Sequence, residues 1–425
     1  MRVSHVALDD FRSYRHAVVE LPRGTTVLIG RNGQGKTNLV EAIAYLSAFS
    51  SHRVAAEGAL VRVPAADSDE ESPGGAVIRV KLVTGESPAP IDEGGTPDAG
   101  GPGEGAQEFR HEQVIELEIV RGRANRARLN RTQVRPRDIL GLVHTVVFAP
   151  EDLQLVRGDP AVRRAFLDEL ATQVRPTLAV VRSDFDRVAR QRAALMKQAQ
   201  ARQRRGMAPD LSTLDVWDEQ FCALSAQLTA ARSALVDLLE DPAARAYDEV
   251  ADSPRHLAIG LDASVDRVLG DGSGGDTPSV AADVDAQAGR LRAALARVRP
   301  KEIERGVNLV GAHRDDLTLS LGGLPVKGYA SHGESWSVAL ALRLAAFSLL
   351  EEGGEEPILV LDDVFSELDA GRREGLARMV SGADQVIVTA AVEEDVPPSL
   401  RGHRLSVRAD AERGTIVGEA DDGAR

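Results

Sequence analysis

One eight-residue segment near the amino terminus constrains this chain more than any other feature. It reads GRNGQGKT, runs from Gly30 to Thr37, and matches the pattern G-x-x-x-x-G-K-[ST]. The β-branched and apolar run 25–29 before it predicts a buried strand, and residues 38–43 after it predict the start of a helix. A glycine-rich turn between a strand and a helix predicts a loop whose backbone N–H groups surround a phosphate.

The pattern assigns a task to each residue type of this phosphate loop (residues 30–37). The glycines let the backbone approach a phosphate closely, Lys36 is expected to reach the β and γ phosphates of ATP, and the Thr37 hydroxyl is expected to bind Mg²⁺. We therefore predict that ATP is bound by Gly30, Arg31, Asn32, Gly33, Gln34, Gly35, Lys36 and Thr37.

An acidic motif far along the chain complements the phosphate loop. The apolar run 358–361 predicts a buried strand that ends in Asp362 and Asp363. We expect Asp362 to hold Mg²⁺ through water and Asp363 to act as general base on the attacking water, which makes Lys36, Asp362 and Asp363 the predicted catalytic residues. The segment 366–369 (SELD) that follows has the arrangement of the D-loop of ABC-type ATPases.

A third motif precedes that acidic strand by one helix. Residues 331–335, the signature segment, read SHGES, resemble the signature motif of ABC-type ATPases, and open an apolar helix over 338–350. A serine hydroxyl and glycine N–H groups at a helix start can bind an anion. In ABC dimers this site completes the ATP pocket of the opposite subunit. The resemblance therefore implies an ATP-sandwiched homodimer in which Ser331, Gly333 and Glu334 contact the nucleotide.

Strand and helix patterns alternate at both ends of the chain, with helical stripes between them. Apolar residues recur every three to four positions in 217–235 and 284–298, which predicts antiparallel packed helices. We predict an α/β P-loop ATPase fold built from both termini, with an inserted all-helical lobe. The expected divisions are 1–155 for the first part of the ATPase lobe, 156–303 for the helical lobe and 304–425 for the rest of the ATPase lobe.

Composition limits the environment and the partners. The Gly-, Pro- and acid-rich segment 86–110 predicts a disordered loop inserted between strands. The single cysteine, Cys222, excludes a disulfide within the chain, and without a signal peptide or a long apolar run we expect a cytoplasmic protein. The net charge of −14 alone argues against nucleic acid as a partner. Arginines nevertheless gather in 121–137 and 187–205, which are either solvated faces or phosphate-binding surfaces.

Together these motifs resemble the RecF family of bacterial DNA-repair proteins. The wide separation of the two ATPase motifs is typical of SMC-like heads, and three further stretches are similar to RecF, namely 11–14 (FRSY), 148–168 and 311–317 (GAHRDDL). The resemblance implies an ATP-dependent clamp that binds DNA where single and double strands meet. It also implies action in recombinational repair, replication restart and the SOS response, loading of recombinase with RecR and RecO, and release of DNA by weak, DNA-stimulated ATP hydrolysis.

Departures from related ATPases leave some roles open. Many ABC ATPases carry glutamate where this chain has Asp363, and Thr389 replaces the switch histidine of transporters, so we expect slow hydrolysis. Arg12 is expected either to contact nucleotide or to be solvated, and His313 either to touch nucleotide or DNA or to be structural. Glu151 is given no metal role.

ATPase motifs of this kind also occur in proteins with two other functions. The alternative is an ABC-type ATPase subunit of another machine, such as a transporter. Three features argue against it: the wide separation of the motifs, the missing switch histidine and the helical insertion. An ATP-dependent nuclease is disfavoured because the part of the chain after residue 390 is too short for a catalytic metal domain.

Overall fold

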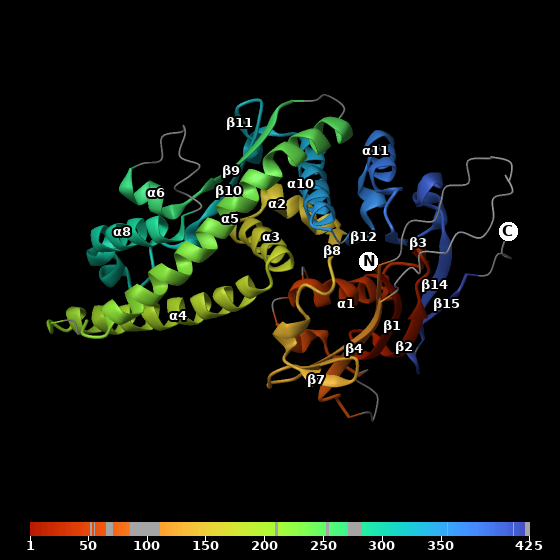
Figure 1. Cartoon of the computed structure of the whole chain (residues 1–425), viewed down its shortest axis with the longest axis horizontal. Coiled ribbons are helices and arrows are strands. Elements are labelled where there is room, and N and C mark those ends of the chain that lie inside the picture. The colour runs from red at the N-terminus through yellow and green to blue at the C-terminus, as the bar shows by residue number, and fades with distance from the viewer. Residues whose placement is uncertain are drawn as a thin grey trace, which may run out of the picture. The chain divides into compact units, whose positions relative to one another are not determined.

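The computed structural model divides the chain into two compact units (Figure 1). Unit 1 comprises Met1–Pro150 and Leu350–Arg425, and unit 2 comprises Glu151–Leu349. The structure describes residues 1–51, 53–54, 56–64, 71–85, 111–208, 211–251, 255–270, 283–354, 356–410 and 412–420. The loop predicted at 86–110 lies outside these described residues.

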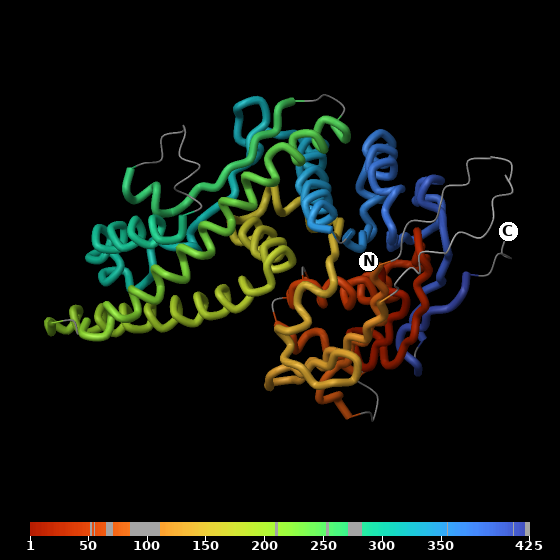
Figure 2. Tube along the Cα trace, in the orientation of Figure 1, coloured from red at the N-terminus to blue at the C-terminus, as the bar shows by residue number. Residues whose placement is uncertain are grey.

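A twelve-stranded mixed sheet frames unit 1, in the order β7-β6-β5-β4-β1-β2-β15-β14-β3-β13-β12-β8. This order interleaves strands from the two ends of the chain, as the red and blue segments of Figure 2 show. The strands are β1 (Arg2–Phe11), β2 (Tyr14–Glu20), β3 (Gly24–Ile29), β4 (Gly75–Thr84), β5 (His111–Val120), β6 (Arg126–Leu129), β7 (Thr132–Val134), β8 (Thr145–Phe148), β12 (Ile358–Asp362), β13 (Gln385–Ala390), β14 (His403–Asp410) and β15 (Gly414–Glu419).

The parallel part of this sheet positions the chemistry. Strand β13 pairs in parallel with β12 on one side and with β3 on the other, and all residues of β12 and β13 are buried. Such strands are covered on both faces, which explains their continuous apolar sequences. Because parallel strands end at the same edge, the segments that follow β3, β12 and β13 meet there. Helix α1 (Lys36–Ala48) starts at this edge and packs Leu39, Ile43 and Leu46 into the core of unit 1.

The rest of unit 1 is antiparallel. Strand β1 lies between β2 and β4, β4 pairs with β5, and Val6 and Leu8 of β1 are fully buried while their neighbours are half-buried. That alternation is the period of two of a strand that packs one face against a core. Helix α11 (Ala370–Val380) and short 3₁₀ turns at Glu57–Leu60, Pro136–Ile139, Val364–Glu367, Glu393–Asp395 and Pro398–Leu400 complete the described part of this unit.

Unit 2 is mainly helical, as the apolar stripes predicted. Its helices are α2 (Leu153–Arg157), α3 (Pro160–Val174), α4 (Thr177–Arg204), α5 (Leu214–Val250), α6 (Ser264–Leu269), α8 (Val284–Arg305), α9 (Val326–Tyr329) and most of α10 (His332–Glu352). The core packs Phe185 and Val188 of α4 against Phe221 of α5 and Leu291 of α8. Among the described residues no helix has the length and apolarity needed to cross a bilayer.

The expectation of an all-helical insertion is wrong in one respect. Unit 2 also holds a three-stranded sheet of β11 (Leu324–Pro325), β10 (Asp316–Leu321) and β9 (Leu257–Asp262). Strand β9 is short and contains Gly260, and its partner β10 is remote in sequence, so no local pattern announced it. The β9–β10 pairing also makes unit 2 extend past the expected boundary at 303, so the signature segment belongs to unit 2.

Candidate nucleotide-binding site

Residues of the β1–β2 and β14–β15 hairpins of unit 1 pack against the outer side of the phosphate loop. Gly35 has φ +104°, and a Cβ there would lie 2.6 Å from Oγ1 of Thr415 and 2.8 Å from Oγ of Ser13. A Cβ on Gly30 would lie 2.2 Å from the carbonyl oxygen of Val407. Both glycines are therefore required by the close packing of protein atoms against the loop, and Gly35 also by its positive φ.

Hydrogen bonds keep the loop in this shape. The Tyr14 hydroxyl donates to the Gly35 carbonyl (3.0 Å), and Oγ1 of Thr415 donates to the Gln34 carbonyl (3.1 Å). The Gln34 side-chain oxygen accepts from the Ala409 N–H (2.5 Å), so this predicted nucleotide contact bonds strand β14. Arg31, Asn32 and Gly33 are exposed. Ser13 and Tyr14 belong to the FRSY stretch, but nothing local in the sequence pointed to Thr415.

Lys36 lies at the first position of α1 with its ammonium group turned into the loop. Its Nζ donates to the Gly30 carbonyl (2.6 Å) and to the Arg31 carbonyl (3.4 Å), and lies 3.9 Å from Oδ1 of Asp363. The side chain is only 3% exposed. A buried ammonium group whose contacts are carbonyls of the loop and one carboxylate is suited to bind a phosphate that enters the same loop.

The structure brings Thr37 and the two acidic residues together at the edge of the parallel sheet. The Thr37 hydroxyl donates to Oδ1 of Asp362 (3.0 Å), and the Thr389 hydroxyl donates to the same oxygen (2.7 Å). Asp363 follows directly, with a left-handed backbone of φ +48°, and its N–H donates to Oγ1 of Thr389 (2.9 Å). An aspartate in this backbone region is uncommon and marks a strained position beside the loop.

The donor set at this edge fits a divalent cation. The Thr37 hydroxyl and the Asp362 carboxylate are hard oxygen donors, 3.0 Å apart. Mg²⁺ prefers such oxygens and takes its remaining ligands from water and phosphates. Thr37 and Asp362 are therefore the residues of this site that could hold it.

Arg12 belongs to a buried ion pair, which rules out the solvated arginine that was one of its two expected roles. Its guanidinium donates to both carboxylate oxygens of Glu41 (2.8 and 2.5 Å), and the Glu41 side chain is 1% exposed. Burial alone would raise the pKa of Glu41, but hydrogen bonds from Arg12 and Ser51 and the charges of Arg12 and Arg53 bring it below its usual value. This pair ties the turn after β1 to helix α1.

The signature segment forms the capped start of α10 in unit 2. The N–H of Glu334 donates to Oγ of Ser331 (3.2 Å), and the Ser331 N–H donates back to Oε2 of Glu334 (2.8 Å). This reciprocal pair is a capping box. Ser331 is exposed and Gly333 is half-buried, whereas the Glu334 carboxylate is occupied by the cap and by Arg255 (3.0 Å). These bonds hold the pKa of Glu334 below its usual value.

Two other singled-out residues lie in unit 2. His313, in the 3₁₀ turn Ala312–Arg314, has its ring centroid 6.0 Å from those of Phe185 and Phe221, and burial lowers its pKa to about 4. Packing of this kind supports the structural alternative for His313. Glu151 is an exposed residue of the 3₁₀ turn Pro150–Asp152.

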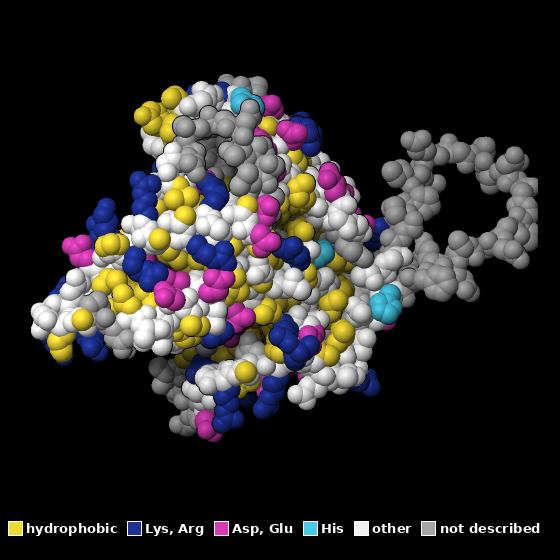
Figure 3. Space-filling view, turned by 60° about the vertical axis from the view of Figure 1, so that its left-hand side comes forward, with side chains coloured by type: hydrophobic (Ala, Val, Ile, Leu, Met, Phe, Trp, Pro, Cys, Tyr) yellow, Lys and Arg dark blue, Asp and Glu magenta, His cyan; other side chains and the backbone are white. Residues whose placement is uncertain are grey.

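The two arginine-rich stretches are partly neutralised by acids. In the first, Arg126, Arg128 and Arg135 pair with Glu118, Glu116 and Asp138. In the second, Arg187 pairs with Asp184, and Arg192 is fully buried. On the face drawn in Figure 3, Lys and Arg side chains are interspersed with Asp and Glu. Acids therefore neutralise part of the positive charge of 121–137, and in 187–205 one arginine is paired at the surface and another is buried.

Comparisons with known proteins match nearly the whole chain. The family model described as RecF/RecN/SMC N terminal domain matches residues 2–399. A protein of Frankia alni named DNA replication and repair protein RecF is 49% identical, over 96% of this chain and 98% of its own. A protein of the same name from Streptomyces avermitilis is 48% identical over the same shares. The solved "Structure of the recombination mediator protein RecF-ATPrS in RecFOR pathway" has a TM-score of 0.78 at 23% identity, covers 98% of both chains, and shows a common fold.

Proposed function

Because this chain belongs to the RecF family of DNA replication and repair proteins, within the RecF/RecN/SMC group, we propose that it is an ATP-gated clamp on DNA. The observation that carries the proposal is the set Lys36, Thr37 and Asp362 at one edge of the parallel sheet. A neighbour in fold is titled as a RecF bound to ATP. ATP and Mg²⁺ are accordingly the ligands proposed here.

The residues of unit 1 divide the work of binding and hydrolysis. The loop N–H groups and Lys36 hold the phosphates, while Thr37 and Asp362 hold Mg²⁺. When bound, Mg²⁺ neutralises charge on the β and γ phosphates. Asp363 accepts a proton from the attacking water, and its short side chain makes hydrolysis slow. The protein is thus a weak ATPase that uses hydrolysis as a switch.

Ser331 completes the site in trans. It is exposed at the start of α10, where the hydroxyl group and the free N–H groups of the first turn favour an anion. In the proposed dimer, Ser331 and Gly333 of one copy contact the γ-phosphate held by Lys36 of the other. Glu334 acts indirectly, since its carboxylate is the partner of Ser331 in the cap.

The clamp closes on DNA where single and double strands meet. Arginines of 121–137 and 187–205 that are not paired with acids are the proposed phosphate contacts, so binding should weaken with salt and depend little on sequence. The proposed partners are RecR and RecO, and the proposed location is the cytoplasm, where chromosomal DNA and ATP are found.

The test is binding to gapped DNA at one salt concentration, with ATP–Mg²⁺, with ADP–Mg²⁺ or without nucleotide. Lys36→Ala should abolish the ATP-dependent gain, whereas Lys301→Ala, an exposed lysine of α8, should not. At Ser331 a matched pair separates charge from capping, because aspartate and asparagine both cap helices well. Ser331→Asn should retain much of the ATP response, and Ser331→Asp should lose it by repelling the phosphate.

Mixing the two inactive variants tests the arrangement in trans. A mixed dimer of Lys36→Ala and Ser331→Asp retains one intact composite site, so the mixture should regain part of the ATP-dependent binding. If it regains none, nucleotide is not shared between copies. If the wild-type protein ignores DNA with every nucleotide at low salt, the clamp is wrong, and an ATPase subunit of another machine becomes the better description.

A further inference from the structure

Thr389 belongs to none of the ATPase motifs, yet its side chain bonds both acidic residues of the site. It lies on β13, one residue before the end of that strand, and is 1% exposed. In the sheet it pairs with Asp362 on β12 and with Leu28 on β3. Thr389 therefore sits on the strand between the one that leads into the phosphate loop and the one that ends in the acids.

The single hydroxyl of Thr389 connects both acidic residues. It donates its proton to Oδ1 of Asp362 (2.7 Å) and accepts the N–H of Asp363 (2.9 Å). The Thr37 hydroxyl donates to the same oxygen of Asp362 (3.0 Å). Two hydroxyl donors thus set the orientation of the carboxylate, and one of them also bonds the backbone of the strained residue that follows.

We propose that Thr389 is a positioning residue that holds the Asp362 carboxylate in place for Mg²⁺ and the Asp363 backbone in place for hydrolysis. The inference rests on the proposed ATP–Mg²⁺ site. The Thr389 hydroxyl bonds protein groups on both sides, so its proposed role is to position these groups and not to contact nucleotide. A β-branched side chain with one hydroxyl suits a buried strand position and offers one donor and one acceptor, as these contacts require.

The strained backbone of Asp363 gives the contact a second consequence. At φ +48° an aspartate is less stable than in a regular strand or helix conformation, so the surrounding structure must hold it. The Thr389 hydroxyl is a hydrogen-bond partner of its N–H, and Ser366 donates to its carbonyl (2.7 Å). Loss of the Thr389 hydroxyl should therefore disturb the general base as well as the metal ligand.

The test is the effect of Mg²⁺ on the affinity for a fluorescent ATP analogue, measured by titration with Mg²⁺ or with EDTA. Thr389→Val removes the hydroxyl and keeps the branched shape. A hydrogen bond to a charged group is strong enough that its loss should reduce the Mg²⁺-dependent gain in affinity about ten-fold, with affinity in EDTA unchanged. Hydrolysis at saturating nucleotide should also fall. Thr389→Ser retains the hydroxyl and should restore both properties.

A neighbouring threonine supplies the control. Thr26 on β3 is fully buried in the same sheet, and within the described structure its hydroxyl has no hydrogen-bond partner. Thr26→Val should leave the Mg²⁺ dependence as in the wild type. Thr389→Cys, with its weak thiol donor, should lie between valine and serine, and it serves if the valine variant folds poorly.

The outcomes separate the two proposals. A wild-type protein that binds the analogue equally in Mg²⁺ and EDTA contradicts the proposed function itself. A wild-type protein with a normal Mg²⁺ response that Thr389→Val shares in full contradicts the inference alone. Equal loss in Thr389→Val and Thr26→Val assigns the effect to packing of the sheet and likewise overturns the role of Thr389.

Discussion

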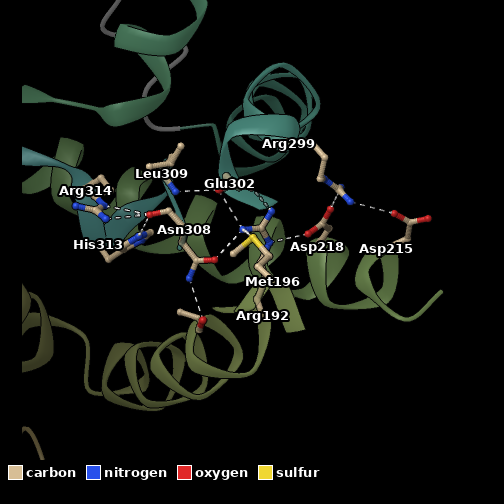
Figure 4. A network of polar contacts seen from close by, with 11 residues as sticks. Arg192, Met196, Asp215, Asp218, Arg299, Glu302, Asn308, Leu309, His313 and Arg314 are labelled. Atoms are coloured by element: carbon tan, nitrogen blue, oxygen red, sulfur yellow. Dashed lines mark hydrogen bonds and ion pairs between the residues drawn. The ribbon is translucent and has the colours of Figure 1, made fainter. Parts of the chain in front are cut away.

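Replacing Arg192 with methionine should destabilise unit 2 more than any surface change of the same kind. Arg192 lies on α4 with its side chain fully buried, at the centre of a network drawn in Figure 4. Its guanidinium donates to both carboxylate oxygens of Glu302 on α8 (2.6 and 3.1 Å) and to Asp218 on α5 (2.6 Å). It also bonds the Asn308 side chain (2.7 Å). One side chain therefore joins three helices and the turn that follows α8.

The magnitude follows from what the substitution leaves behind. Methionine fills most of the space of the arginine stem, so little packing is lost. The Glu302 carboxylate, 0% exposed, keeps the Leu309 N–H as a donor (2.8 Å) but loses its positive partner. Removing one member of a buried ion pair costs about 3–5 kcal/mol, because the remaining charge stays out of water.

Urea unfolding followed by tryptophan fluorescence measures the loss in the free energy of unfolding of unit 2. Both tryptophans of the chain, Trp217 and Trp336, lie within Glu151–Leu349, so the signal reports on unit 2. With a slope of about 2 kcal/mol per M of urea, a loss of about 4 kcal/mol lowers the midpoint by about 2 M.

A matched control and a double variant test whether the shift of the urea midpoint comes from the stranded charge of Glu302. Arg292 on α8 pairs with Glu219 on α5, but both side chains are at least half exposed, so Arg292→Met should leave the midpoint unchanged. Adding Glu302→Leu to Arg192→Met removes the stranded carboxylate and should recover part of the loss. If Arg192→Met shifts the midpoint no more than Arg292→Met does, the reasoning from the buried charge is wrong.

Three further predictions concern the phosphate loop, His313 and Asp363. Gly35→Ala should lower the free energy of unfolding by about 2 kcal/mol and abolish nucleotide binding, because its Cβ would meet Thr415 and Ser13. Gly33→Ala, whose Cβ would have no heavy atom within 4 Å, should lower it by only about 1 kcal/mol, for its positive φ. Thermal melting and nucleotide titration compare the two variants. The pKa of His313 is lowered to about 4 in the folded protein, from an ordinary value of 6.5, mainly by burial, so its contribution is fully present above pH 6.5 and is lost as the pH falls towards 4. Wild-type stability should then drop by on the order of 2 kcal/mol more than that of His313→Asn between pH 7 and pH 5, and equal drops would contradict this. Asp363→Asn should reduce ATP hydrolysis about 100-fold with nucleotide binding retained, since asparagine tolerates the left-handed backbone; unchanged hydrolysis would exclude Asp363 as general base.

The sequence predicted those parts of the site whose signals are local. Residues 30–37 carry their own glycines, lysine and threonine, and the acids follow directly on a continuous apolar strand, so spacing alone placed them at strand ends. Thr415, which supports the loop, had no local signal, because it meets Ser13 through a hydrogen bond across 402 positions. The same holds for the buried network of unit 2, where Arg192 meets Glu302 across 110 positions, since no periodicity links such pairs.

Glu334 illustrates a different limit. The pattern S-x-x-E at a helix start is a capping box as well as part of a signature-like motif, and the sequence does not separate the two. The structure shows the carboxylate bonded to the Ser331 N–H and to Arg255. The structure thus establishes the capping role of Glu334, and its contact with nucleotide stays a prediction.

The order of the strands explains why Thr389 lies between the phosphate loop and the acidic residues. The phosphate loop follows β3 and the acids follow β12, and Thr37 reaches Asp362 across 325 positions of sequence. Strand β13 lies between these two strands, and Thr389, one residue before its carboxyl end, pairs with Asp362 on β12 and with Leu28 on β3. The short Thr389 hydroxyl bonds Asp362 and the Asp363 N–H, so one oxygen atom links the proposed metal ligand to the proposed general base. Changes at Thr389 should therefore alter Mg²⁺ affinity and hydrolysis together and never one alone.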